Sequence, residues 1–526
     1  MHSALGAVFA LIVVVCAVSP KVWELIRVLI LGPIFGLLIW GEEKLSGCFS
    51  LRFPRSLAEL LSDPQPFFRL VRRQVGVHAA LRDPSPLAAD ATLASCARLR
   101  ELTTEPMKNA TTFPLELTLA DGATLAVFVK LQCGRGAPLW LQAVTKAVEL
   151  GMQRESDFYK ILAAHVPIRV PRPYAIDRID VFNRCCLVLE CIEGGKAIAD
   201  WEGCPIPAIG AMLRDAAKLH AQFLECTSTS AATRWIPSAA ASRSAGALHY
   251  VKWIGDLTSD HKASFRRVWS ALNSHPFFAP AAGEGGDHDA VRSPLALVHG
   301  DCRPGNMLFL GALDDADAPP SVVFADWEAV NVAPPLWDVV YCTTLGVDPD
   351  KHDEMTVATL REEYARELLA TAEHASPGSA AGKRVRALYD PDTAEGVERI
   401  VAEGKLLLLV LAFVSYTVVK KNLWNQGNTN DDNVAWRAST IVYNCLHLYC
   451  LQPLRSLCAH HSLLLSFLPP PPSTGSRVFR ALRALDAEEM AEELNRSSST
   501  LRGVSIDAAC FREVVATITS IGEGEE

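Results

Sequence analysis

Three polar side chains between Leu297 and Asp338 have the types and spacing needed for chemistry on a phosphate. Asp301 and Asn306 lie five positions apart in the segment HGDCRPGN, and Asp326 follows a short apolar run. Two short strands joined by the polar turn from Gly311 to Ser321 would bring Asp326 back beside Asn306. Oxygen atoms of carboxylates and amides are ligands that suit Mg²⁺, so this pattern predicts a site for Mg²⁺ with bound phosphates.

Phosphoryl transfer assigns a separate task to each of these residues. An aspartate orients and deprotonates the attacking hydroxyl, while an asparagine and a second aspartate hold metal against the nucleotide phosphates. We expect Asp301 to be the base, and Asn306 and Asp326 to be the metal ligands. Arg303 would stabilise the transferring phosphate with its charge, or would instead form a salt bridge to a neighbouring acid. In a purely structural alternative, Asp301 caps the loop and Asn306 is a turn residue.

The same stretch is similar to a known superfamily. The segment HGDCRPGN has the spacing of the protein-kinase catalytic loop, H-R-D-x-x-x-x-N, and Asp326-Trp327-Glu328 stands where that superfamily carries D-F-G. With HGD in place of HRD and DWE in place of DFG, it resembles the aminoglycoside/choline phosphotransferase branch of the kinase-like fold. The resemblance implies ATP and Mg²⁺ as cofactors. It also implies a two-lobed α+β fold, with a small antiparallel β lobe and a larger helical lobe.

A lysine inside an apolar strand is the second chemical feature. The pattern from Pro114 to Leu119, the turn Asp121-Gly122 and the run from Thr124 to Leu131 predict a β-hairpin with Lys130 in its second strand. A lysine in a buried strand is costly unless it is paired. In kinase-like folds such a lysine binds the nucleotide phosphates and pairs with a helix glutamate, for which Glu155 is the candidate. Otherwise Lys130 would be an edge-strand lysine that guards against aggregation.

The segments around this lysine resemble the choline/ecdysteroid-kinase-like branch of the superfamily. VFVKLQ, ESDFYKILAAHVPIRVPRPY and CCLVLECIEG follow one another as they do in that branch, and the likeness is strongest from Met107 to Leu345. The resemblance implies that residues 187–193 form the hinge strand between the lobes. Backbone groups there, at Glu190 and Ile192, are then expected to bind adenine.

The loop over the nucleotide phosphates is where this sequence departs from the kinase pattern. No G-x-G-x-x-G precedes Lys130. The loop would therefore lie near residues 108–112, where Thr111 and Thr112 offer hydroxyl and backbone N–H groups to the phosphates. We include both threonines among the expected nucleotide-binding residues.

The N-terminal 45 residues predict a membrane-associated hydrophobic helical segment. Two apolar runs, Ala4 to Val18 and Val22 to Trp40, follow one another, and a transmembrane helix needs about 20 residues. They fit a single span or a hairpin, a cleaved signal peptide, or an apolar helix packed on the core. Two runs in series exceed what a signal peptide needs, which favours the membrane anchor. Basic residues between 44 and 55 favour a cytosolic position for the kinase domain.

The remaining segments of the chain are expected to form the following regions. We expect a helical lead-in at 46–105, a kinase-like small lobe at 106–195, a large lobe at 196–468, and a proline spacer with a tail at 469–526. In the large lobe, His220 is expected to be a structural residue of a long helix. Asp338 resembles the aspartate that starts a helix and braces the catalytic loop.

Composition excludes several classes of function. The chain has 526 residues with a net charge of −9, so nothing suggests a nucleic-acid surface, and no obligate protein partner is evident. Its 15 cysteines include no C-x-x-C, which predicts buried thiols in a reducing compartment rather than disulfides or a zinc site.

The expected function is therefore ATP- and Mg²⁺-dependent phosphorylation of a hydroxyl on a small molecule. A protein kinase is one alternative, but no A-P-E motif follows Asp326, and Gly300 replaces the arginine that reads an activation-loop phosphate. A non-catalytic, membrane-tethered pseudokinase that binds nucleotide is the other. The presence of Lys130, Asp301, Asn306 and Asp326 argues against it.

Overall fold

The computed structural model describes part of the chain between Ser56 and Leu407. The described residues are 56–79, 87, 90–99, 111–132, 152–179, 184–198, 203–224, 293–348, 351, 354–375, 377–401, 403, 404 and 407. The predicted membrane-associated segment at 1–45 and the predicted spacer and tail at 469–526 lie outside them. Among the helices that are described, none combines the length and the apolar content that crossing a bilayer requires.

The chain divides into two compact units. The described residues up to Gly195 form the first unit together with Phe324–Val330, and the described residues from Lys196 onward form the second apart from that segment. Among the described residues, those of the first unit contain an antiparallel sheet, and those of the second are mostly helical. The α+β class predicted from the sequence is therefore confirmed.

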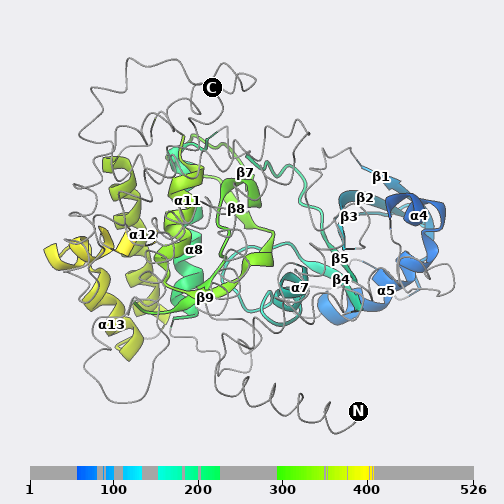
Figure 1. The fold of residues 1–526 in the computed structure, drawn as a ribbon. Coiled ribbons are helices and arrows are strands. Elements are labelled where there is room, and N and C mark those ends of the chain that lie inside the picture. The colour runs from blue at the N-terminus through cyan, green and yellow to red at the C-terminus, as the bar shows by residue number, and fades with distance from the viewer. Residues whose placement is uncertain are drawn as a thin grey trace, which may run out of the picture. The chain divides into compact units, whose positions relative to one another are not determined.

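A five-stranded antiparallel sheet in the order β1-β2-β3-β5-β4 forms the centre of the first unit (Figure 1). Its strands are β1 (Leu93–Arg98), β2 (Thr111–Leu119), β3 (Thr124–Gln132), β4 (Pro173–Ile179) and β5 (Arg184–Glu190). The predicted hairpin joins β2 to β3. Gly122 adopts a φ of 87°, which glycine tolerates without strain, and the Asp121 carboxylate accepts a hydrogen bond from the N–H of Ala123.

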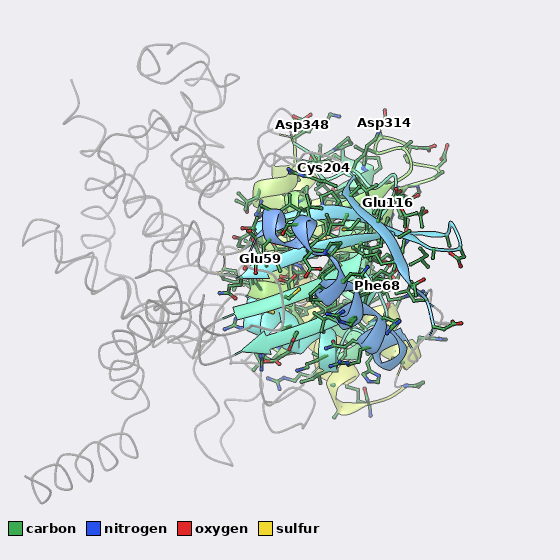
Figure 2. The ribbon with its side chains drawn as sticks, turned by 90° about the vertical axis from the view of Figure 1, so that its right-hand side faces the viewer. Glu59, Phe68, Glu116, Cys204, Asp314 and Asp348 are labelled. Carbon is green, nitrogen blue, oxygen red and sulfur yellow. The ribbon has the colours of Figure 1, made fainter. Side chains whose placement is uncertain are left out.

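Two helices, α4 (Leu57–Ser62) and α5 (Gln65–Ala79), lie over one face of this sheet (Figure 2). Alternate residues of β2 and β3 pack there with Phe68 of α5 in one buried apolar cluster. The strand residues of that cluster are Phe113, Leu115, Leu117, Leu119, Leu125, Val127, Val129 and Leu131. Because successive strand residues point to opposite faces, the same alternation directs Lys130 to the other face of the sheet.

The predicted helical lead-in at 46–105 is wrong beyond α5, because strand β1 forms within it. In its sequence LASCAR only Leu93 is buried, and no β-branched residue is present to indicate a strand. The strand exists because it pairs with β2, from Leu93 opposite Leu119 to Arg98 opposite Leu115. That partner is the next strand, beyond residues 99–110, so the sequence of β1 alone does not reveal the pairing.

Helices that pack against one another make up much of the described part of the second unit (Figure 1). They are α8 (Ile206–Gln222), α11 (Leu336–Gly346), α12 (Glu354–Ala375) and α13 (Ala380–Tyr389). Two short strand pairs accompany them: β6 (Ala296–Val298) with β9 (Asn331–Ala333), and β7 (Met307–Leu310) with β8 (Ser321–Phe324). The loop at 299–306, which ends in the 3₁₀ turn η4 (Pro304–Asn306), connects β6 to β7. This connection is the predicted catalytic loop.

Candidate active site

Lys130 is held between two carboxylates in the first unit. Strand β3 supplies the lysine, and α7 (Met152–Ile161) supplies Glu155. The Lys130 Nζ atom lies 2.6 Å from Oε2 of Glu155 and 2.7 Å from Oδ1 of Asp326. The side chain of Glu155 is fully buried, whereas that of Asp326 is 31% exposed. The predicted Lys130–Glu155 pair is confirmed, and the edge-strand alternative is wrong because β3 lies inside the sheet between β2 and β5.

These charges determine the ionisation of the cluster. Burial by itself lowers the pKa of Lys130, but the negative charges of Asp326 and Glu155 outweigh it, and the pKa rises well above its usual 10.5. Lys130 is therefore a cation at every physiological pH. Burial raises the pKa of Glu155 above its usual 4.5, against the attraction of the ammonium. The ammonium has three N–H donors and these two carboxylates take two of them, so the third can donate to an anion such as a phosphate.

The segment that carries Asp326 packs against α7 through a pair of stacked aromatic rings. Asp326 adopts a left-handed conformation, with φ 61° and ψ 60°, which aspartate tolerates better than most residues. The Trp327 ring stacks on Phe158 with centroids 3.8 Å apart and planes inclined by 7°. Sequence analysis did not identify this stack. The only feature of the sequence that points to this stack is the position of Phe158, three residues after Glu155, which places both side chains on the same face of the helix.

Asp301, Arg303 and Asn306 form a hydrogen-bonded group within the catalytic loop of the second unit. The Asn306 Nδ2 atom donates to the Oδ2 atom of Asp301 at 2.7 Å and to its backbone oxygen at 2.9 Å. Because both amide protons are used in this way, the Asn306 Oδ1 atom is the one left to bind a cation. The Arg303 Nε atom lies 3.3 Å from each carboxylate oxygen of Asp301. Of the two roles expected for Arg303, the structure shows the salt bridge.

A buried aspartate braces this loop from α11. The two carboxylate oxygens of Asp338 accept hydrogen bonds from the backbone N–H groups of His299, at 2.7 Å, and Gly300, at 2.9 Å. Its Oδ2 atom also lies 3.1 Å from Nε2 of His220. The structural roles predicted for Asp338 and His220 are therefore confirmed.

Gly300 has a backbone conformation that explains its residue type. Its φ is 85°, in the region where a side chain would be strained, and its carbonyl oxygen accepts a hydrogen bond from Nε1 of Trp337 at 3.1 Å. An arginine, as in the protein-kinase H-R-D sequence, would adopt this conformation only with strain. The glycine thus follows from the path of the loop.

Thr111 and Thr112 lie in strand β2, so the prediction that they belong to a phosphate-binding loop is corrected. Their backbones are part of the sheet, opposite Leu131 and Lys130 respectively. Residues directly opposite in a sheet share a face, so Thr112 is on the face of Lys130 and Thr111 is not. The preceding part of the expected loop, 108–110, lies outside the described residues. A contact between Thr112 and phosphate stays a prediction.

The two residues expected to bind adenine lie at the end of strand β5 and just beyond it. The Glu190 N–H donates to the backbone oxygen of Arg172 at 2.7 Å, and the Glu190 carboxylate accepts from the Arg172 N–H at 3.1 Å. Of its backbone groups, the carbonyl is therefore the one that an adenine amino group could use. Ile192 is buried just beyond the strand. Adenine binding by Glu190 and Ile192 stays a prediction.

The oxygen atoms expected to bind Mg²⁺ belong to Asp326 in the first unit and Asn306 in the second. Asp326 has a second carboxylate oxygen besides the one bonded to Lys130, and Asn306 has its amide oxygen. No group of three His, Cys, Asp or Glu side chains in the described part of the chain could hold a metal ion alone. Mg²⁺ usually keeps several waters and takes phosphate oxygens as further ligands, so one or two protein oxygens fit its chemistry.

Residues 119–380 match the phosphotransferase enzyme family. No curated protein matches this chain in sequence. Three solved structures are similar to it at low identity. A Ralstonia eutropha protein described as an aminoglycoside phosphotransferase is 14% identical, with a TM-score of 0.39 over 72% of this chain and 98% of that one. A choline/ethanolamine kinase family protein from Mesorhizobium loti is 14% identical, with a TM-score of 0.38 over 72% and 93%. An ethanolamine kinase from Plasmodium vivax is 11% identical, with a TM-score of 0.37 over 78% and 94%.

Proposed function

This chain belongs to the phosphotransferase enzyme family, and from that premise we propose that it phosphorylates a hydroxyl of a small molecule with ATP and Mg²⁺. The observation that carries the proposal is the Lys130 ammonium, held at 2.6 Å from Glu155 and 2.7 Å from Asp326. Removing a lysine and a glutamate from water is expensive, and a purely structural need is met more cheaply by apolar side chains. The cluster supports a role in binding a polyanionic nucleotide.

Each residue then has one task in the reaction. Lys130 binds the nucleotide phosphates, and Glu155 holds the lysine in place. Asp326 and Asn306 would hold Mg²⁺, which supplies positive charge to the phosphate oxygens. The acceptor oxygen bonds to the γ-phosphorus as the bond to ADP breaks, and the hydroxyl proton passes to Asp301. Arg303 orients the Asp301 carboxylate through their salt bridge.

A small-molecule acceptor is better supported than a protein. Gly300 stands where protein kinases carry an arginine that reads a phosphorylated loop, and its φ of 85° disfavours any such side chain. Choline-like amines, sugars, steroids and lipid alcohols all bear suitable hydroxyls. ATP turnover with peptides and with a panel of these alcohols separates the two acceptor classes.

The test is a screen of metabolite extracts with the purified chain, ATP and Mg²⁺, in which products that gain one phosphate are detected by mass spectrometry. Asp301→Asn should abolish product formation. Asp215→Asn, on the outer part of α8 in an ion pair with Lys218, is the control and should retain it. Equal rates for Asp301→Asn and the unmodified chain would refute the base assignment. Nucleotide binding that does not depend on Mg²⁺, without any ATP turnover, would favour the pseudokinase.

We also propose that residues 1–45 attach the enzyme to a membrane with the kinase domain on the cytosolic side. The support is the two apolar runs and the basic residues that follow them. The full chain should sediment with membranes and resist alkaline carbonate, and lysines placed at Ile12 and Leu31 should release it. A soluble full chain would refute the proposal.

A further inference from the structure

A tyrosine on α12 ends a chain of buried hydrogen bonds that starts at the catalytic loop. Asp338 holds the backbone N–H groups of His299 and Gly300, and it lies 3.1 Å from Nε2 of His220. On the other side of the imidazole, Nδ1 of His220 lies 2.6 Å from the hydroxyl oxygen of Tyr364. The side chains of His220 and Asp338 are fully buried, and Tyr364 is 1% exposed.

These contacts favour one arrangement of protons. The Asp338 carboxylate is an acceptor, so the nitrogen that faces it, Nε2 of His220, must carry a proton. In the neutral imidazole Nδ1 is then an acceptor, and the Tyr364 hydroxyl is its donor. Burial, followed by the negative charge of Asp338, raises the pKa of Tyr364 well above 10, so the hydroxyl keeps the proton that it donates.

We propose that Tyr364 is a positioning residue for the catalytic loop. Its hydroxyl fixes the tautomer and the orientation of His220. His220 Nε2 then stays the third hydrogen-bond donor to the Asp338 carboxylate, beside the backbone N–H groups of His299 and Gly300. The inference rests on the proposed function, because the next residue of that loop is the expected base, Asp301. Tyr364 acts through His220 and Asp338 and is not itself a catalytic residue.

The ring contact supports the same role. The Tyr364 and His220 rings meet edge to face, with centroids 5.8 Å apart and planes inclined by 68°. Phenylalanine in place of the tyrosine keeps this contact and removes only the hydroxyl. Nδ1 of His220 then loses its donor inside the protein, where an unpaired nitrogen is unfavourable. The imidazole turns towards another partner, and Asp338 and the loop amides lose their fixed positions.

A matched control lies in the same unit. The hydroxyl of Tyr389 in α13 donates to Oε1 of Glu403 at 2.6 Å, and Tyr389 is also 1% exposed. Its bond is as short and as buried as that of Tyr364. The other contacts of the Glu403 carboxylate are a hydrogen bond from Ser293 and an ion pair with Arg399, which both lie outside the catalytic loop. Tyr389→Phe therefore removes an equivalent hydroxyl from a carboxylate that does not hold the loop.

The experiment compares Tyr364→Phe with Tyr389→Phe in the full chain. We expect both to lower the melting temperature by similar amounts. We expect Tyr364→Phe alone to lower kcat, by roughly tenfold for one lost hydrogen bond, with KM for ATP unchanged. Equal kcat values for the two variants would overturn the proposal, and so would a loss in KM for ATP without a loss in kcat.

A second measurement is independent of turnover. Long-range ¹⁵N–¹H spectra of histidine-labelled protein, with His220 assigned by its loss in His220→Gln, distinguish the two neutral tautomers and the imidazolium. We expect the tautomer protonated at Nε2 in the unmodified chain and a changed spectrum in Tyr364→Phe. The Nδ1-protonated form, an imidazolium, or an unchanged variant spectrum would overturn the proposal. If the spectra agree but no acceptor is ever phosphorylated, the proposed function fails and the positioning contact stands.

Discussion

Replacing Lys130 with methionine should destabilise the protein in a way that depends on pH. The methionine fills a similar volume on β3 but removes the ammonium that lies 2.6 Å from Glu155 and 2.7 Å from Asp326. Glu155 has no exposed side-chain surface, so its charge is left without a cation in the protein interior. Asp326 is 31% exposed, so solvent compensates for much of its loss.

The expected magnitude follows from Glu155. Leaving a buried carboxylate unpaired costs about 3–5 kcal/mol. The carboxyl can instead take up a proton, which at pH 7 costs about 3.4 kcal/mol for a group of ordinary pKa 4.5 and at pH 5 only about 0.7 kcal/mol. The variant adopts whichever of these two states of Glu155, charged or protonated, has the lower free energy. Lys130→Met should therefore lower the free energy of unfolding by about 3 kcal/mol at pH 7.

The sign of the pH dependence is fixed by the direction of the pKa shift. Burial raises the pKa of Glu155 in the folded state, and removal of Lys130 removes the attraction that opposes this rise. A carboxyl with a raised folded-state pKa contributes stability that is fully present below its unfolded pKa and is lost as the pH rises through the folded value. The variant should therefore be closest to the unmodified chain near pH 5 and should fall behind it towards pH 7.

Urea unfolding followed by tryptophan fluorescence at pH 5, 6 and 7 measures this difference. Lys160→Met on the exposed side of α7 is the matched control and should change stability by less than about 0.5 kcal/mol at each pH. A difference between Lys130→Met and the unmodified chain that stays constant from pH 5 to 7 would show that Glu155 is not left as an unpaired charge. Equal stability of the two variants would refute the ion-pair reasoning altogether.

Three further predictions concern the metal ligand and the catalytic loop. Asp326→Asn should remove the part of the nucleotide-induced rise in melting temperature that depends on Mg²⁺, measured with and without EDTA, and a full Mg²⁺ response would contradict its role as a ligand. Asp338→Asn turns one acceptor of a backbone N–H into a donor, so kcat should fall roughly 100-fold for a loss of about 3 kcal/mol, measured by ADP release. Gly300→Ala should lower the free energy of unfolding by about 1–2 kcal/mol because of the φ of 85°, measured by urea titration; an unchanged midpoint would show that the loop relaxes.

The chemical residues were predictable because they stand out from their surroundings in the sequence. Lys130 is a charge inside an apolar strand, and a buried charge requires a partner, which led to Glu155. Asp301, Asn306 and Asp326 follow the spacing of the kinase-like motif that this sequence resembles. The two structural assignments, His220 and Asp338, were made from position in a helix and a motif, and their contacts agree with them.

Other features depend on how neighbouring segments pair and on the path of the backbone. Thr111 and Thr112 have the hydroxyls of a phosphate loop, but pairing with β3 places them in a strand. Strand β1 has almost no apolar alternation and exists through its pairing with β2. Arg303 had two expected roles, and the path of its loop places it in a salt bridge with Asp301.

The sequence by itself therefore determined which side chains are expected to carry the chemistry, because unusual residue types at fixed spacings are visible without coordinates. The tertiary structure decided how these side chains are held. Tyr364 has no distinguishing feature in the sequence, but α12 packs on α8 and places its hydroxyl oxygen 2.6 Å from Nδ1 of His220. The physical reason is that a hydrogen bond between distant segments depends on the packing of whole helices, and no short stretch of residues records it.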